Sequence, residues 1–250
     1  MIESLEARIA PAALISFTEI DGDLITIKTN KGTNGDLATA AGLENGATGV
    51  NGFSLRFIKS EGLADLFAGT NVTITAKKLG DGNGRADKVV IDASDNGEND
   101  IDLGKVTIKG NIQQFDAGDA NLQTLAVKKL TALSFTTGVV NGESPAISLL
   151  RGDTGAILVK GDFNGHLRSA TDIESSLGAT IASLTVNGDI ATEDGDRTGF
   201  VEAFSIGALT VKGTFFGSGD GSANNGLIRA TAVSNIKIAQ MSLNARIDLV

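Results

Sequence analysis

The sequence of 250 residues contains no cysteine, no tryptophan, no tyrosine and only two prolines. The absence of cysteine excludes a disulfide scaffold, a thiolate metal site and a cysteine nucleophile. His166 is the only histidine, so a histidine-rich metal site is excluded and any serine–histidine–aspartate triad would have to use this residue. We expect His166 to lie at a corner of the fold or to be exposed.

Long hydrophobic runs and an excess of positive charge are also missing. No apolar stretch approaches the roughly 18 residues that cross a bilayer, so we expect no transmembrane segment. The formal net charge is -9 at pH 7. Because nucleic acids carry a dense negative charge, this balance predicts no nucleic-acid partner.

What the sequence does contain is glycine, at 32 positions, and one strand-like phrase that recurs. The phrase reads "DLGKVTIKGNI" at 102–112, "TIASLTVNGDI" at 180–190 and "SIGALTVKGTF" at 205–215. Aligning its second apolar residue gives Ile108, Val127, Val159, Val186, Val211 and Ile238. Their spacing is 19, 32, 27, 25 and 27 residues, which clusters near 26. Repeats of this length without helices are typical of a β-solenoid.

Each period contains two further short apolar segments. One precedes the phrase, as in "VVIDAS" at 89–94 and "HLRSAT" at 166–171. The other follows it and is marked by Ile112, Phe163, Ile190 and Phe215. We therefore predict an all-β protein, a right-handed parallel β-helix with about three short strands per coil. A sandwich of hairpins is the alternative, but sandwiches seldom repeat one strand motif at a nearly fixed interval.

The alternation of residues within the phrase predicts which side chains point inward, because successive strand residues face opposite sides. Leu209 and Val211 are expected inward, and Thr210 and Lys212 outward. The same assignment places further residues in the core: Val106, Ile108, Leu184, Val186, Ile236 and Ile238. The glycine that ends the phrase is expected at a corner with positive φ. These glycines are Gly110, Gly161, Gly188 and Gly213.

The chain is expected to form one solenoid domain over residues 15–250, preceded by an N-terminal motif at 1–14 that is a targeting remnant or a cap. Coils are irregular over 15–100 and regular over 101–250. At most one or two short helices are expected near the N-terminus, one of them in "SEGLADLFAG" at 60–69. The irregular part should cap the first coil. At the other end Ile247, Leu249 and Val250 continue the strand pattern, which predicts self-association or continuation of the chain there.

Two parts of the sequence resemble a known group of proteins. "SLEARIAPA" at 4–12 resembles the LEPR-type N-terminal motif of large bacterial extracellular proteins, although Ala7 stands where that family often has proline. "FTEIDGDLITIKTNKG" at 17–32, followed by the repeated phrase, is similar to the β-helical region of some of them. The resemblance implies export, an extracellular or cell-surface location and a structural role. It brings no catalytic residues.

Acidic glycine-rich turns are the only candidate metal sites in the sequence. "DGNGRAD" places Asp81, Asn83 and Asp87 at a spacing that suits calcium, which takes six to eight oxygen ligands. "DGD" at Asp21–Asp23 is similar in kind. The closing glutamate of an EF-hand and the calcium-binding nonapeptide repeat are both absent. We therefore interpret these segments as ordinary turns and expect no cofactor, with calcium at Asp81, Asn83 and Asp87 as the alternative.

The sequence is most consistent with a non-catalytic, extracellular or cell-surface protein of structural or adhesive function. Other surface proteins or polysaccharides are the expected partners. The alternative is a polysaccharide lyase or hydrolase on a β-helix scaffold. Such an enzyme needs clustered charged residues in a groove, and sugar rings commonly stack on tryptophan or tyrosine, which this chain lacks. No residue is predicted to be catalytic.

Overall fold

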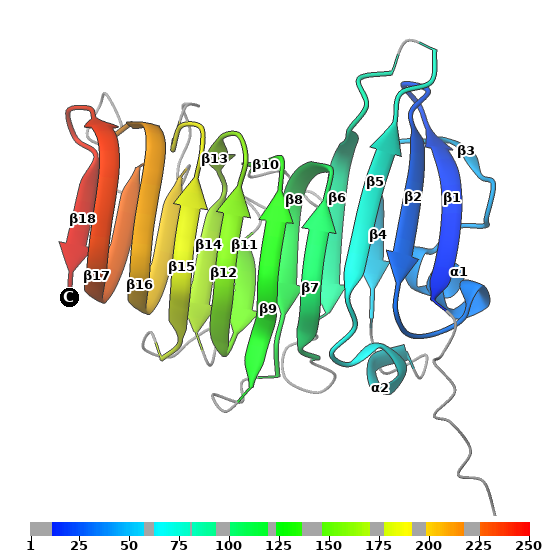
Figure 1. Cartoon of the computed structure of the whole chain (residues 1–250), viewed down its shortest axis with the longest axis horizontal. Helices are drawn as coiled ribbons and strands as arrows, with labels where there is room; N and C mark the ends of the chain where they lie inside the picture. The colour runs from blue at the N-terminus through cyan, green and yellow to red at the C-terminus, as the bar shows by residue number, and fades with distance from the viewer. Residues whose placement is uncertain are drawn as a thin grey trace, which may run out of the picture.

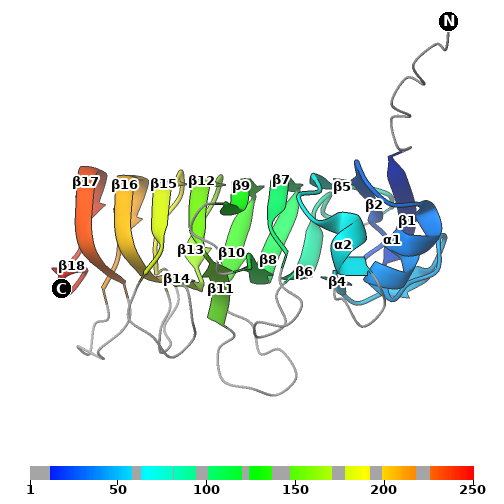
Figure 2. The same ribbon diagram turned by 90° about the horizontal axis from the view of Figure 1, so that it is seen from below.

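The computed structural model describes residues 12–57, 63–80, 82–93, 101–119, 124–136, 147–170, 178–191, 199–217 and 226–250. Strands dominate these residues, and most pair in parallel along one elongated stack (Figure 1). Two short helices lie at the N-terminal end of the stack (Figure 2). This arrangement confirms the all-β class and is compatible with a β-solenoid. No helix among the described residues is long and apolar enough to span a membrane.

One long side of the stack, sheet A, contains the repeated phrase. Its parallel strands are β5 (Val72–Lys77), β7 (Leu103–Ile108), β9 (Leu125–Ala132), β12 (Asp153–Val159), β15 (Thr180–Val186), and the middle parts of β16 (Phe200–Phe215) and β17 (Leu227–Met241). β16 and β17 are long because each begins in a second sheet and then bends into sheet A.

The second long side, sheet B, also consists of parallel strands. They are β4 (Phe53–Arg56), β6 (Ala86–Ala93), β8 (Gly110–Ala117), β11 (Ile147–Arg151), β14 (His166–Ala170), the first parts of β16 and β17, and β18 (Arg246–Leu249). A narrow third side is formed by β10 (Ser134–Thr136), β13 (Phe163–Asn164) and single bridges through Ile190. The segments at Phe163, Ile190 and Phe215 that follow the phrase thus pair with one another on this side.

Equivalent residues stack in register through these sheets, with one correction to the predicted repeat. Val127 pairs with Leu103 and Thr154, so it is not equivalent to Ile108. Ala132 pairs with Val159 and takes that place instead. The column then runs through residues 108, 132, 159, 186, 211 and 238, with steps of 24, 27, 27, 25 and 27 residues. The repeat is therefore more regular than the sequence alignment indicated.

The core lies between the sheets and contains the inward residues that the alternation predicted. Val106, Ile108, Leu184, Val186, Leu209 and Val211 are all buried. On the third side, Phe135 and Phe163 pack with ring centroids 5.1 Å apart. Ile236 and Ile238 face the same way but are not buried, and Ile236 is 49% exposed. They lie in the last strand of sheet A, where no described strand covers them.

The structure corrects the positive φ that was expected at the glycines that end the phrase. These glycines are required instead because neighbouring corners stack closely. None of Gly110, Gly161, Gly188 and Gly213 has a positive φ. A Cβ added to Gly188 would lie 2.6 Å from the carbonyl carbon of Gly161 and would overlap the carboxylate of Asp162. The amide of Gly188 donates to the carbonyl of Gly161 at 3.0 Å. The corner thus has no room for a side chain.

The aspartates beside these glycines connect one corner to the next. The carboxylate of Asp162 accepts a hydrogen bond from the amide of Asp189 at 2.9 Å. Asp189 in turn accepts from the amide of Thr214 at 2.5 Å. Hydrogen bonds to charged groups contribute more than neutral ones, so the Gly-Asp corners stabilise the stack as well as turning the chain.

The N-terminal end of the stack is closed by a change from parallel to antiparallel pairing. β1 (Ala13–Glu19) and β2 (Leu24–Thr29) form a hairpin that pairs antiparallel with β5. β3 (Thr48–Val50) covers the end of β1. α1 (Asn34–Ala41) begins with a capping box of Thr33 and Asp36, and α2 (Leu63–Phe67) is the helix that the sequence predicted.

The backbone amides on the outer edge of β1 donate hydrogen bonds to other parts of the chain. Leu14 donates to the side chain of Asn34 at 2.7 Å, and Ser16 donates to that of Asn45 at 2.8 Å. The amides of Thr18 and Ile20 donate to backbone carbonyls of residues 47 and 50. Unpaired edges invite further strands, so this end is a cap, as expected. At the opposite end β18 extends sheet B, but no described strand pairs with the outer edge of β17 over residues 232–241.

We predict that Gly188→Ala destabilises the protein by about 2 kcal/mol or more, because the corner backbone must shift to admit a methyl group. Gly35→Ala is the matched control. Gly35 lies in α1, where an added Cβ meets only Thr33 at 3.7 Å, and alanine favours a helix over glycine by about 0.5–1 kcal/mol. Urea unfolding of both variants measures the difference, and equal stability of the two would contradict the stacked-corner interpretation.

Candidate functional site

Glu19 is an acidic residue at an inward position of a strand. In β1 the buried residues alternate, and Ala13, Ile15, Phe17 and Glu19 share the inward side. The first three are apolar, whereas Glu19 places a carboxyl group where only 3% of the residue is exposed. Acidic residues are almost never fully buried unless they are paired. Its surroundings are therefore the first place to seek a function.

The turn after Glu19 brings two more carboxylates close to it. Gly22, with φ of 91°, donates its amide to the carbonyl of Glu19 at 3.0 Å and closes a tight turn. The amide of Glu19 donates to the carbonyl of Asp23 at 2.9 Å. Asp21 accepts from the amide of Asp23 at 3.1 Å, which fixes the side chain of Asp21 beside the turn.

Asp23 anchors this turn to the loop that precedes β6. It is fully buried, and its Oδ2 atom accepts from the amides of Gly84 at 2.5 Å and Arg85 at 3.1 Å. Gly82 lies against the other carboxylate oxygen, where a Cβ would overlap it. The hairpin turn and the loop are distant in sequence, and Asp23 holds them together.

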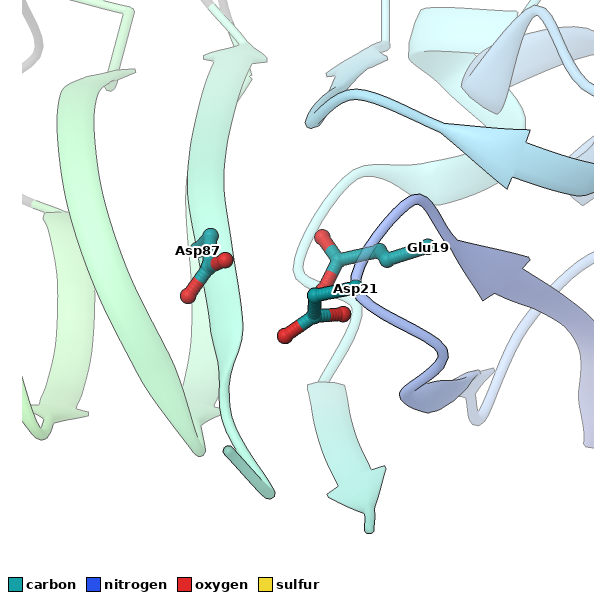
Figure 3. A group of neighbouring side chains, drawn as sticks. All are labelled: Glu19, Asp21 and Asp87. Carbon is teal, nitrogen blue, oxygen red and sulfur yellow. The ribbon is translucent and has the colours of Figure 1, made fainter. Parts of the chain in front are cut away.

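Asp87, in β6, completes a cluster of three carboxylates with Glu19 and Asp21. One carboxylate oxygen from each lies within 4.8 Å of the others. Figure 3 shows Glu19 and Asp21 extending from the β1–β2 turn toward Asp87 on the neighbouring strand. We call these three residues the acidic cluster.

The acidic cluster strongly perturbs the ionisation of Glu19. Burial, with the negative charges of Asp87, Asp21 and Asp23, raises the pKa of Glu19 to about 7, although the backbone amide of Asp87 acts to lower it. Among the described residues neither carboxylate oxygen of Glu19 has a hydrogen-bond partner of normal geometry. Glu19 is therefore partly protonated near neutral pH, and a positive charge that entered the cluster would favour its ionised form.

The depth of Glu19 limits what the acidic cluster can do chemically. A raised pKa is the property of a general acid in glycoside hydrolysis, but such an acid must contact the sugar. With 3% of its surface exposed, Glu19 cannot reach a polysaccharide. A proton or a small cation is the kind of species that fits.

The residues predicted as a calcium loop are only partly brought together. Asp81 lies outside the described residues. Asn83 donates its side-chain amide to Asp87 at 2.7 Å and accepts from the amide of Arg85 at 2.9 Å, so both ends of its side chain are engaged by protein groups. Asp87 is joined by Glu19 and Asp21. The sequence analysis missed Glu19, although an acidic residue that continues the inward series of β1 is a signal that could have identified it. Its proximity to β6 depends on the fold.

His166 forms a second polar cluster on sheet B, and its position corrects the sequence prediction. It begins β14 directly after a corner but is only 2% exposed. Its Nε2 atom lies 3.0 Å from a carboxylate oxygen of Glu202, and its ring stacks on Phe200 at 4.6 Å. Glu202 also accepts from Arg229 at 3.3 Å. The partner of His166 is 36 residues away in sequence, which is why spacing did not identify it.

The charges around Glu202 form a column of alternating sign across the outer side of sheet B. Arg168 pairs in register with Glu202, Glu202 with Arg229, and Arg229 with Asp248. Burial of Glu202 acts to raise its pKa, but the hydrogen bond and attraction of His166, with the positive charges of Arg168 and Arg229, outweigh burial. The pKa of Glu202 is therefore below its ordinary value. The ion pair of Glu202 with Arg229 and its hydrogen bond with His166 therefore stabilise the stack.

We predict that Glu202→Gln destabilises the protein at pH 7 by about 1–3 kcal/mol, the contribution of hydrogen bonds to a charged group. A lowered folded-state pKa gives stability that is present above the unfolded-state pKa and lost as the pH falls through the folded value. The difference between wild type and variant should therefore narrow below about pH 4.5. Denaturant unfolding at several pH values measures this, with exposed Glu44→Gln as the control. If the difference in unfolding free energy between the wild type and Glu202→Gln does not change with pH, the lowered pKa of Glu202 is contradicted.

Comparison of the chain with protein-family models, with curated proteins and with solved structures finds no significant match. No family membership follows, and the function must be inferred from the stack, its two ends and the polar clusters.

Proposed function

We propose that the protein is a right-handed parallel β-helix that acts as a non-catalytic structural or adhesive element outside the cell or on its surface. The in-register columns of sheets A and B support the β-helix. The resemblance of residues 4–12 to an N-terminal motif of bacterial extracellular proteins supports the location. The observation that carries the structural role is the contrast between the capped N-terminal end and the uncovered C-terminal end.

The uncovered end combines apolar side chains with unpaired backbone. Ile236 is 49% exposed and Met241 46%, and both lie in the part of β17 whose outer edge has no described partner strand. An edge of this kind accepts another strand through its free N–H and C=O groups. We infer that this edge takes up another strand, either from a second copy of the chain or from a continuation of the chain.

Capping of the N-terminal end limits the size of the assembly. Where the occupant is a second copy, the two copies join through the same uncovered surface, which gives a two-fold symmetric, tail-to-tail contact. A two-fold axis normal to sheet A pairs the two β17 edges antiparallel and keeps their apolar faces on the same side. The expected product is a dimer and not a filament.

The enzyme alternative has no observation in its favour among the described residues. The acidic cluster is too deep for a polysaccharide to contact, and Glu202 is paired with His166 and Arg229. The structural role therefore remains our proposal. Incubation with acidic and neutral polysaccharides is expected to release no new sugar ends.

Sedimentation velocity of the 250-residue chain over a concentration series tests the end contact. The wild type is expected to form a reversible dimer. The double variant Ile236→Lys with Ile238→Lys should stay monomeric, because it places charge in the contact. The double variant Thr210→Lys with Asn235→Lys adds the same charge at outward positions of the same sheet and should still dimerise.

Three results would contradict this proposal. A wild type that is monomeric at all concentrations would mean that the β17 edge does not associate. Growth beyond a dimer would mean that the N-terminal end is not closed. Release of sugar ends from a polysaccharide would favour the enzyme.

A further inference from the structure

We propose that Glu19, Asp21 and Asp87 form a binding site for a hard divalent cation, calcium, which fastens the N-terminal hairpin to the first parallel strands of the stack (Figure 3). The site differs from the loop that the sequence indicated, because two of its three carboxylates come from the β1–β2 turn. It is independent of the proposed dimer, which uses the opposite end of the molecule.

The separation of the three carboxylates suits a single ion. Calcium binds oxygen at 2.3–2.6 Å, so two atoms that ligate one calcium ion are at most about 5 Å apart. The three carboxylate oxygens lie within 4.8 Å of one another and satisfy this limit. All three ligands are hard oxygen donors, which favour calcium or magnesium over zinc or copper.

The burial of Glu19 is an independent indication of a bound cation. Only 3% of the residue is exposed, and neither of its carboxylate oxygens has a hydrogen-bond partner of normal geometry among the described residues. A buried carboxylate without a well-aligned partner is costly, because its lost contacts with water are not replaced by comparable hydrogen bonds. Its strongest electrostatic neighbours are Asp87, Asp21 and Asp23, which are all acidic. A cation between these groups supplies the missing partner.

The ligands are held in place before any ion binds. Asp21 is fixed by the amide of Asp23, and Asp87 is fixed by the side chain of Asn83. Asp23 joins the turn to the loop before β6 through two backbone amides. Ligands positioned in this way lose little conformational entropy on binding, which favours affinity.

The location of the site gives the ion a structural role. Glu19 and Asp21 belong to the antiparallel hairpin, whereas Asp87 belongs to β6 of sheet B. An ion that binds all three connects the cap to the stack across more than 60 residues of chain. Binding to the folded state alone stabilises that state by mass action.

Thermal unfolding of the full chain at pH 8, after treatment with EGTA, tests the proposal. Calcium chloride is expected to raise the Tm of the wild type, and isothermal titration should detect one site. Glu19→Gln and Asp21→Asn keep the shape of each side chain but remove one ligand charge, and each should weaken calcium binding at least tenfold. Glu44→Gln removes the same charge from an exposed position and should bind like the wild type.

The variants also separate loss of binding from loss of folding. In EGTA, Glu19→Gln should melt no lower than the wild type, because it relieves repulsion within the acidic cluster. No calcium-dependent rise in the wild-type Tm would overturn the site. An equal calcium-dependent rise in the Tm of Glu19→Gln and Asp21→Asn would place the ion elsewhere. An equal rise in the wild-type Tm with magnesium chloride would overturn the assignment to calcium.

Discussion

Parallel strands that stack in register must satisfy their backbone hydrogen bonds with the strands above and below, and each repeat is shaped by this requirement. Side chains at equivalent positions lie over one another, so apolar residues such as Val159, Val186 and Val211 form continuous columns. The corners must stack as closely as the strands, which excludes a side chain at Gly188. The carboxylates of Asp162 and Asp189 then bind amides that the bending backbone leaves without a strand partner.

The same requirement makes the ends of the stack the places where chemistry can differ. At the N-terminal end an antiparallel hairpin replaces the next parallel strand, and Asn34 and Asn45 bind the amides of its outer edge. The reversal of direction carries the hairpin turn back to the first strands of sheet B. Glu19 and Asp87 meet at that junction, and the described residues of the regular repeats contain no similar group of carboxylates.

The alternation of apolar residues was sufficient to predict the strands, the inward residues and the segment at Phe163 and Ile190, because these depend on local periodicity. Ala132 was missed because a small residue occupies a position that is larger in the other repeats, while "TLAVKKL" five residues earlier imitates the phrase. Sequence alone cannot distinguish a glycine needed for positive φ from one needed for close approach. The acidic cluster depends on pairing between distant segments, which no local pattern encodes.

The alternating column of Arg168, Glu202, Arg229 and Asp248 has a consequence for how such a chain can change in length. Deletion of the single repeat that carries Glu202 would set Arg168 directly beside Arg229, and opposed like charges destabilise a sheet. Deletion of two successive repeats would instead bring Arg168 beside Asp248 and preserve the attraction. In this part of the stack, evolutionary gain or loss of repeats is therefore electrostatically tolerated in pairs and opposed one at a time.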